Sequence, residues 1–283
     1  MSQAEKPILL IALMHDYAAR DFLDSGVLDE LAKEFRLGFI STDRLTLDLS
    51  RYGPIVARHA IGRWRLVVYQ LAAGLWHMSV KDRFELDGRK TLGLATLGLS
   101  AKVTRLVRWL SKVHLARPSS VALRAVLRTT APRMIPDGYD ALAILAYTSV
   151  RSYFVDDVVR DAKRCGLHLL ASMNNWDCLN TKAFFETPPY LGVWGEQGFL
   201  IARLMHGIPS HRIFVIGAPR FEVYRRRPIS REEARQRLNL PADRRVLLFC
   251  GAGVPFDEVS LLEELDRAIE TGQLPRNLLV VYK

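Results

Sequence analysis

Residues 172–222 read SMNNWDCLNTKAFFETPPYLGVWGEQGFLIARLMHGIPSHRIFVIGAPRFE, and this stretch is the most informative about the fold. Its pattern predicts the end of a strand, a polar loop, a short strand, a helix, a third strand and a second polar loop. The polar residues follow the strand-like runs instead of lying within them. Because an open parallel α/β sheet binds its ligands beyond the carboxyl ends of its strands, we expect function to lie in these loops.

The same alternation of strand and helix extends on both sides of this stretch. Strand-like runs are found at residues 8–14, 37–41, 141–147, 167–172, 191–194 and 212–216, and helical spacing at residues 22–35, 152–164 and 196–206. Alternation of this kind predicts the α/β class, with a mainly parallel sheet and helices on both faces. His206 and Gly207 read as a helix end, with Gly207 in the left-handed conformation and His206 at the negative end of the helix dipole.

Length and cysteine content indicate a globular protein of a reducing compartment. The chain has 283 residues, enough for one large or two ordinary domains. Its three cysteines are far apart and lack CxxC spacing, so neither a disulfide framework nor a structural metal site is expected. The apolar run near the N-terminus follows an acidic residue and reads as a first strand, not as a signal peptide. We therefore expect a cytoplasmic protein.

One segment carries the whole basic excess of the chain. Residues 51–133 hold 16 lysines and arginines against 3 acidic residues, a formal charge of +13, whereas the whole chain carries +10. The region from about residue 51 to 134 reads as two or three helices inserted between strands, and its longest uncharged run, residues 66–80, is too short to cross a bilayer. We expect this basic helical insertion to face an anionic partner.

Three interpretations of the insertion stay open. An amphipathic surface against anionic membrane lipid is favoured over a solvated helical subdomain with aromatic core residues. Nucleic acid is the least favoured partner; it would use Trp64, Tyr69, Trp76 and Trp109 as stacking groups.

The last part of the chain predicts the beginning of a second domain. We expect an N-terminal Rossmann-like domain at residues 1–218, a linker with one short helix at 219–244, and a new βαβ unit at 245–283. Ser230 and Glu233 have the spacing of a capping box at the start of the linker helix. Because a βαβ unit of this length cannot cover both faces of its own sheet, we expect the second domain to continue beyond Lys283.

These features together resemble the GT-B glycosyltransferases. One run of this chain is similar to a run in lipid-A-disaccharide synthase-like, Kdo-transferase-like and UDP-GlcNAc 2-epimerase-like proteins. It consists of a helix, HGIP at 206–209, a strand, and GAPRFE at 217–222. The NWD and TK pieces at 175–177 and 181–182 resemble a motif of CDP-glycerol glycerophosphotransferase-like enzymes. Two details depart from these patterns: Glu222 stands where an Asp is usual, and the second Asn precedes the Trp.

The resemblance implies a GT-B-like fold, with an acceptor domain followed by a nucleotide-donor domain. It also implies a transferase of cell-surface polysaccharide or lipid biosynthesis, with a nucleotide-linked sugar or glycerol donor, a lipid-linked or polysaccharide acceptor, and no metal or resident cofactor. Such an enzyme would be peripheral at the inner face of the cytoplasmic membrane. The alternatives are a UDP-sugar 2-epimerase-like enzyme and a donor-incompetent domain that binds a membrane or a partner.

The loop after the 167–172 strand holds the main candidate site. It brings together two amides, a carboxylate, a hydroxyl and an ammonium group, from Asn174, Asn175, Trp176, Asp177, Thr181 and Lys182. Such a set can bind sugar hydroxyls or a phosphate, and Asp177 can act as general base for an acceptor hydroxyl. The alternative is a loop tied by Asx-turns, with Trp176 as a packing anchor.

Further candidates lie at other strand ends. His15 and Asp16 follow the first strand and could supply a base, although an N-capping Asp16 beside a solvated His15 is the favoured interpretation. Glu196 opens a helix, where a carboxylate is favourable in any case, and is a candidate substrate contact.

The two glycine-bearing turns are the candidate sites for donor phosphate. Gly217 stands at a turn that could equally be a hinge, with Arg220 as the phosphate-binding side chain beside it. Gly251 and Gly253 lie between a strand and a helix, where backbone N–H groups can approach a pyrophosphate.

Overall fold

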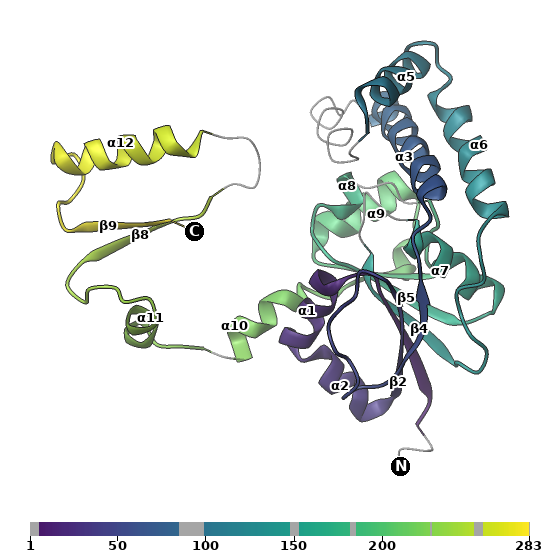
Figure 1. Cartoon of the computed structure of the whole chain (residues 1–283), viewed down its shortest axis with the longest axis horizontal. Coiled ribbons are helices and arrows are strands. Elements are labelled where there is room, and N and C mark those ends of the chain that lie inside the picture. The colour runs from purple at the N-terminus through teal and green to yellow at the C-terminus, as the bar shows by residue number, and fades with distance from the viewer. Residues whose placement is uncertain are drawn as a thin grey trace. The chain divides into compact units, whose positions relative to one another are not determined.

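The computed structural model describes residues 6–84, 99–147, 153–181, 185–226, 228–251 and 257–282. The chain divides into two compact units, Met1–Arg226 and Arg227–Lys283. Figure 1 shows the course of the chain through both units.

The first unit is built on a parallel sheet. The described residues form seven strands in the order β3-β2-β1-β4-β5-β6-β7, all in parallel pairs. The strands are β1 (Ile8–Leu13), β2 (Arg36–Thr42), β3 (Ile55–His59), β4 (Ala141–Tyr147), β5 (His168–Met173), β6 (Tyr190–Val193) and β7 (Ile213–Val215). This is the doubly wound order of Rossmann-like sheets with one more strand, and it confirms the predicted α/β class and parallel sheet.

Helices cover both faces of this sheet, as predicted. The helices of the first unit are α1 (Asp16–Ser25), α2 (Val27–Glu34), α3 (Arg63–Phe84), α5 (Ala101–Lys112), α6 (Ala116–Thr129), α7 (Phe154–Arg164), α8 (Cys178–Thr181), α9 (Glu196–His206) and α10 (Glu222–Arg226). Figure 1 shows α1 and α2 on one side of the strands and α7 on the other.

The pleat of β1 explains why both faces are covered. Leu9, Ile11 and Leu13 belong to the core shared with α1 and α2, whereas Leu10 and Ala12 belong to the core shared with α7 and α9. Successive side chains of a strand point to opposite faces, so an uninterrupted apolar run demands apolar partners on both. The run at residues 8–14 therefore places β1 in the middle of the sheet.

Two predicted elements differ from the structure. The helix predicted over residues 22–35 is two helices, because Gly26 adopts a left-handed φ of 72° that ends α1. The strand β3 was not predicted; it lies in the segment assigned to the helical insertion. It is an edge strand that pairs only with β2 and tolerates the polar Arg58 and His59.

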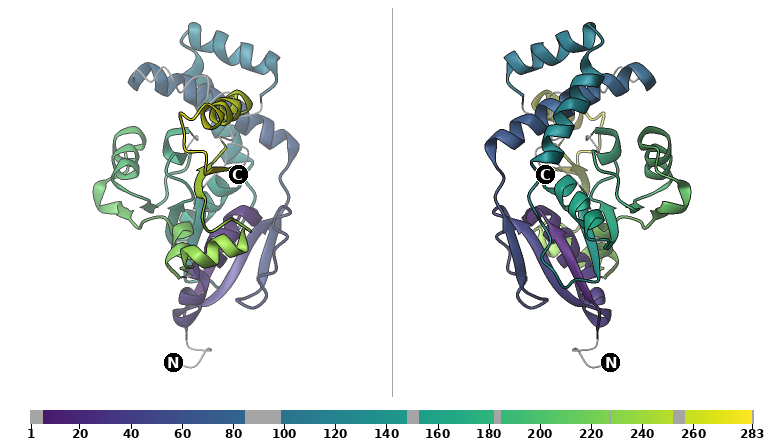
Figure 2. Two further views of the ribbon diagram at one scale, coloured as in Figure 1. Left: turned by 90° about the vertical axis from the view of Figure 1, so that its left-hand side faces the viewer. Right: turned by 90° about the vertical axis from the view of Figure 1, so that its right-hand side faces the viewer.

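The basic insertion forms its own helical layer, in which α3, α5 and α6 share a core that includes Tyr69, Leu75 and Val107. Figures 1 and 2 show these helices together at one end of the first unit. No helix among the described residues combines the length and the apolar character needed to span a membrane.

A group of charged side chains, all buried or nearly so except the half-exposed Arg128, joins the insertion to the sheet. We call it the charged junction: Arg65 of α3, Arg128 of α6, Asp157 and Arg160 of α7, and Glu186 after α8. Arg65 donates from both terminal nitrogens to the Asp157 carboxylate at 2.5 and 3.0 Å, and Arg160 donates to the same carboxylate at 2.9 Å. Glu186 accepts from Arg128 at 2.8 Å and from Arg160 at 3.2 Å.

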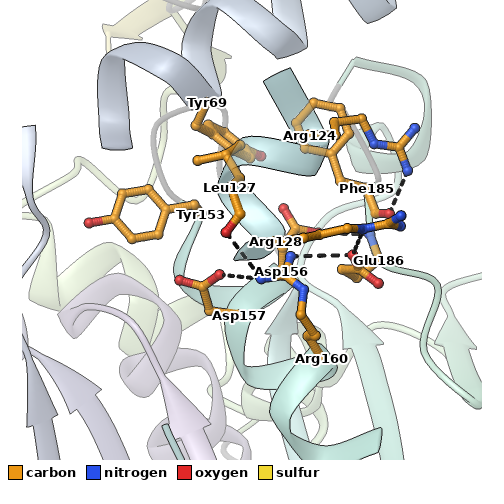
Figure 3. A pocket seen from close by; sticks show the side chains of 10 residues that line it. All are labelled: Tyr69, Arg124, Leu127, Arg128, Tyr153, Asp156, Asp157, Arg160, Phe185 and Glu186. Atoms are coloured by element: carbon orange, nitrogen blue, oxygen red, sulfur yellow. Dashed lines mark hydrogen bonds and ion pairs between the residues drawn. The ribbon is translucent and has the colours of Figure 1, made fainter. Parts of the chain in front are cut away.

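Most of the charged junction is drawn in Figure 3, where the side chains of α6 and α7 meet around a cavity of about 10 Å³. That volume holds about one water molecule, so the junction is packed and is not a ligand pocket. Burial raises the pKa of Asp157 above its ordinary value, although the two arginines act in the opposite direction. The charged carboxylate is therefore maintained by its guanidinium partners.

His206 is the last residue of α9, as predicted. Gly207 ends α9 in the left-handed conformation, as expected. However, burial lowers the pKa of His206, and its ring donates from Nε2 to the Leu179 carbonyl at 2.8 Å. It stacks on Trp76 of α3 at 5.7 Å between ring centroids. The neutral ring thus packs the insertion against α9.

The second unit contains one parallel βαβ unit, formed by β8 (Arg245–Phe249), α12 (Glu258–Glu270) and β9 (Leu278–Tyr282). It is preceded by α11 (Arg231–Arg237), where the Glu233 N–H donates to the Ser230 hydroxyl at 3.0 Å. The first half of the predicted capping box is therefore confirmed. The beginning of the predicted linker, residues 219–226, packs on α1 within the first unit.

Replacement of Asp157 by asparagine should destabilise the protein strongly. The change leaves the Arg65 guanidinium, whose side chain is 7% exposed, without its counter-charge. Removing one partner of a buried ion pair costs about 3–5 kcal/mol in the free energy of unfolding. Asp137→Asn is the matched control, because its ion pair with Arg133 is exposed and should change stability by less than about 1 kcal/mol. Urea denaturation followed by tryptophan fluorescence measures both, and equal losses would contradict the role of the junction.

Candidate functional site

A pocket of about 180 Å³ lies at the carboxyl ends of β5 and β6, and we call it the β5–β6 pocket. It is lined by the end of β5 and its loop, by the end of β6 and by the first turn of α9: Met173, Asn175, Trp176, Leu179, Val193, Trp194, Gly195, Gln197 and Gly198. This is the edge of the sheet at which the sequence predicted a ligand. The volume is below the roughly 300–1,000 Å³ of pockets that enclose a whole small molecule, so it admits part of a larger ligand.

The two indoles of the pocket are held in different ways. Trp194 donates from Nε1 to the Met173 carbonyl at 2.9 Å, which fixes its ring between the ends of β5 and β6. Trp176 is 56% exposed, and the Asn175 side chain accepts from its backbone N–H at 3.1 Å. This bond joins neighbouring residues and is not the predicted Asx-turn, which would reach two residues along the chain. Trp176 is also not a buried packing anchor. Its ring is available to a ligand.

The first turn of α9 forms another side of the pocket. Gly195 is its N-cap, in an extended conformation, and supplies no side chain to cap the helix. Gly198 lets α9 approach β6 closely, because a Cβ at this position would meet the Val193 Cβ at 3.0 Å. Unpaired N–H groups at the start of a helix attract anions and hydroxyl oxygens. The pocket thus offers backbone donors beside the Gln197 amide.

Arg220 links this region to α1. Its guanidinium donates to the Asp21 carboxylate at 2.6 Å and to the Asn174 carbonyl at 3.2 Å. It also lies over the rings of Tyr17 and Trp194, at 5.1 and 5.3 Å from their centroids. With this set of partners, Arg220 holds the loop after β5 in place, and its charge is balanced by Asp21 before any phosphate binds.

The remaining residues of the predicted loop lie beside the pocket. Asn174 is buried, and Asp177 is half-buried directly before α8, where its carbonyl accepts from the Asn180 N–H at 3.0 Å. Asp177 follows Trp176 in the chain but does not line the pocket. Thr181 is the last residue of α8, and Lys182 lies outside the described residues.

His15 and Asp16 are both engaged with the backbone. His15, not Asp16, is the N-cap of α1, and its Nδ1 accepts from the Ala18 N–H at 3.2 Å. Burial lowers the pKa of His15, so the neutral ring carries its proton on Nε2 and can present a donor. Asp16 accepts from the Thr46 hydroxyl and N–H at 2.5 and 2.6 Å, which lowers its pKa. It ties the loop after β2 to α1.

The other residues that the sequence predicted for a site do not line the β5–β6 pocket. Glu196 is exposed at the start of α9 and does not line the pocket. Gly217 takes a left-handed φ of 75° after β7, with nothing within 4 Å of an added Cβ. Gly251 is exposed after β8 in the second unit, and Gly253 lies outside the described residues. Among the described residues, no cluster of His, Cys, Asp or Glu side chains could hold a metal ion.

The sequence did not identify two residues of this region, Trp194 and Asp21. Trp194 directly follows β6, so the rule that ligands bind at carboxyl strand ends could have identified it. Asp21, the partner of Arg220, lies 199 residues away in the sequence. No spacing rule connects such a pair, and only the packing of residues 219–226 on α1 brings it together.

Comparisons with known proteins give structural likenesses only, since no protein-family model and no curated protein matches the chain. A UDP-N-acetylglucosamine 2-epimerase from Rickettsia bellii is 13% identical, with a TM-score of 0.45; the match covers 98% of this chain and 62% of that one. MurG from Acinetobacter baumannii is 12% identical, with a TM-score of 0.38, over 98% of this chain and 66% of that one. Arabidopsis thaliana UGT89C1 complexed with quercetin is 12% identical, with a TM-score of 0.44, over 99% and 70%.

The first of these likenesses is to one of the groups that the sequence resemblance names. The chain spans less than two thirds of the length of the epimerase and about two thirds of the length of MurG. At these identities and TM-scores, the likenesses identify no substrate for this chain.

Replacement of Arg220 by alanine should lower the free energy of unfolding of the first unit by about 2 kcal/mol. This is less than the loss for a fully buried ion pair, because the side chains of Arg220 and Asp21 are both partly exposed. The Asp21 carboxylate would lose its counter-charge, and the Asn174 carbonyl would lose a donor. Arg212→Ala is the control, since Arg212 is exposed and has no ion pair among the described residues. Thermal and urea unfolding of both variants measure the difference, and an Arg220 variant as stable as the control would disprove its linking role.

Proposed function

We propose that this protein is a GT-B-type transferase of cell-surface polysaccharide or lipid biosynthesis. It would move a sugar or glycerol-phosphate group from a nucleotide-linked donor to a lipid-linked or polysaccharide acceptor. The donor nucleotide enters as a substrate, and we expect neither a resident metal nor a cofactor.

The β5–β6 pocket is the observation that carries this proposal. Its Trp176 and Trp194 rings offer flat apolar faces, while Asn175, Gln197 and the first turn of α9 offer hydrogen-bonding groups. Sugars and polyols present hydroxyl groups around an apolar carbon frame, so a ligand of this class suits the combination. The small volume fits one unit of a longer acceptor or donor.

Asp177 is our proposed general base. Its carboxylate would take the proton of the acceptor hydroxyl as that oxygen attacks the transferred group, and the nucleotide would leave with the bonding electron pair. Backbone N–H groups around Gly251 of the second unit would hold the donor phosphates. His15 would serve as a hydrogen-bond donor through Nε2, because its Nδ1 is occupied by the Ala18 N–H.

Asp177→Asn should lower kcat about 100-fold to 10,000-fold, because the amide cannot accept the proton. Trp176→Ala should raise KM for the saccharide substrate with a smaller effect on kcat. The melting temperature of both variants is measured as well, so that a loss of turnover is separated from a loss of stability. Release of nucleotide from UDP-sugars, GDP-sugars and CDP-glycerol, with and without lipid or oligosaccharide acceptors, measures the activity of the full-length protein.

Tyr190→Ala is the control for Trp176→Ala, since Tyr190 is also an exposed aromatic residue but stands at the start of β6 and does not line the pocket. Unchanged turnover in the Asp177 variant would remove its assignment as the base. Conversion of a UDP-sugar to its 2-epimer without any acceptor would replace the transferase by an epimerase.

We further propose that the insertion docks the enzyme on an anionic membrane surface, at the inner face of the cytoplasmic membrane. Residues 99–130 contain seven lysines and arginines and no acidic residue. On α5, Leu106, Trp109 and Val113 are spaced at i, i+3 and i+7 and are 45%, 55% and 42% exposed. Exposed apolar side chains in a row next to basic ones are typical of a helix that lies in a membrane interface.

The aromatic residues of the insertion favour the membrane over nucleic acid. Tyr69 lies in the helical core, and Trp76 is stacked on His206, so neither can stack on a base. The exposed Trp109 instead belongs to the apolar row of α5. Arg105, Arg108 and Lys112 are basic neighbours on the same helix. Arginine and lysine beside such a row attract anionic headgroups.

The triple variant Arg105→Gln, Arg108→Gln and Lys112→Gln should bind anionic vesicles about 100-fold more weakly, at about fivefold for each basic residue. The control removes three exposed arginines elsewhere, Arg203, Arg212 and Arg231, and should change binding much less. Co-sedimentation with phosphatidylglycerol and phosphatidylcholine vesicles measures both variants. Equal binding to the two lipids by the unchanged protein would contradict the electrostatic attraction.

A further inference from the structure

A second and larger cavity lies at the same edge of the sheet, and we call it the β3–α7 cavity. It has a volume of about 430 Å³ and shares no lining residue with the β5–β6 pocket. Its walls come from the end of β3, the first turns of α3 and α7, and the segment after α6. The volume is within the roughly 300–1,000 Å³ range of pockets that enclose small molecules.

The walls of this cavity are held in place without a ligand. The Gly62 N–H donates to the Tyr153 hydroxyl at 2.6 Å, which ties the start of α3 to the start of α7. The His59 ring donates from Nε2 to the Met134 carbonyl at 3.1 Å. The buried Asp161 carboxylate accepts from the Met134 and Ile135 N–H groups at 2.7 and 2.9 Å. The cavity is therefore preformed, as binding sites usually are.

The charges around the cavity favour an anion. Arg65 and Asp157 line it but neutralise each other. Arg58 also lines it, is exposed, and has no ion pair within the described part of the chain; one of its N–H groups donates to the Leu45 carbonyl at 2.9 Å. Its remaining donors have the fork geometry that suits a phosphate.

The rest of the cavity is apolar. Ile61, Trp64, Pro132, Met134 and Phe154 line it, and Trp64 is 53% exposed. We propose that the β3–α7 cavity binds a phosphate ester that carries an apolar or aromatic group, with the phosphate at Arg58 and the apolar group against Trp64 and Phe154. This site goes beyond the proposed transferase function and does not depend on it, because binding is measured without turnover.

Isothermal titration of the full chain tests the site with four probes: geranyl phosphate, UMP, inorganic phosphate and geraniol. At least one of the two phosphate esters should bind with an affinity ten times or more that of inorganic phosphate and of geraniol. The reason is that inorganic phosphate lacks the apolar group and geraniol lacks the phosphate. Geranyl phosphate and UMP distinguish a lipid source from a nucleotide source of the same chemistry. Arg58→Gln should weaken the binding of the ester about tenfold or more, through loss of a charge-assisted hydrogen bond.

Arg63→Gln is the matched control, because Arg63 is exposed nearby but does not line the cavity; it should change the affinity less than about threefold. Trp64→Ala should weaken the ester and leave inorganic phosphate unchanged. The site would be disproved if neither ester binds at millimolar concentration, if Arg58→Gln binds like the unchanged protein while melting at the same temperature, or if Arg63→Gln is as damaging as Arg58→Gln. None of these outcomes depends on transferase activity.

Discussion

The buried ion pair between Arg65 and Asp157 is the interaction on which the arrangement of the first unit depends. It joins the first turn of the insertion to α7, which packs on the central sheet. Asp157 is 1% exposed at its side chain, so its charge is tolerated only because two guanidinium groups surround it. The same contact positions the first turn of α3 and thus one wall of the β3–α7 cavity. One pair of charges therefore contributes both to the attachment of the insertion and to a wall of the cavity.

The parallel sheet explains why two cavities occupy one edge. Every loop that leaves the carboxyl end of a strand emerges on the same side, and the loops after β3, β5 and β6 all do so here. The insertion begins at this edge and carries its basic, partly apolar helices away from the sheet (Figure 2). The basic surface that we propose to face anionic lipid and the two cavities thus belong to one unit of the chain. We infer that the insertion brings this edge near a membrane-bound acceptor.

Much of the sheet could be predicted, because β1, β2, β4 and β5 are apolar runs with helical spacing between them. The edge strand β3 could not, since Ile55–His59 is short, ends in Arg58 and His59, and is recognisable only from its pairing with β2. Of the candidate site residues, Asn175 and Trp176 line the β5–β6 pocket, and the sequence analysis did not name Trp194, which also lines it. The expected cap of α1 was the wrong residue, because the side chain that reaches the Ala18 N–H is that of His15.

The sequence by itself determined the α/β class, the parallel sheet, the basic insertion and the polar loop after β5. These features follow from local patterns, because the spacing of apolar residues and the charge of a segment can be read from neighbouring positions in the sequence. Only the tertiary structure decided which side chains meet. Arg220 pairs with Asp21, and Arg65 pairs with Asp157. The ring of His206, whose pKa is lowered by burial, stacks on Trp76. These contacts join residues far apart in the chain, and their energies depend on burial, which no local pattern records.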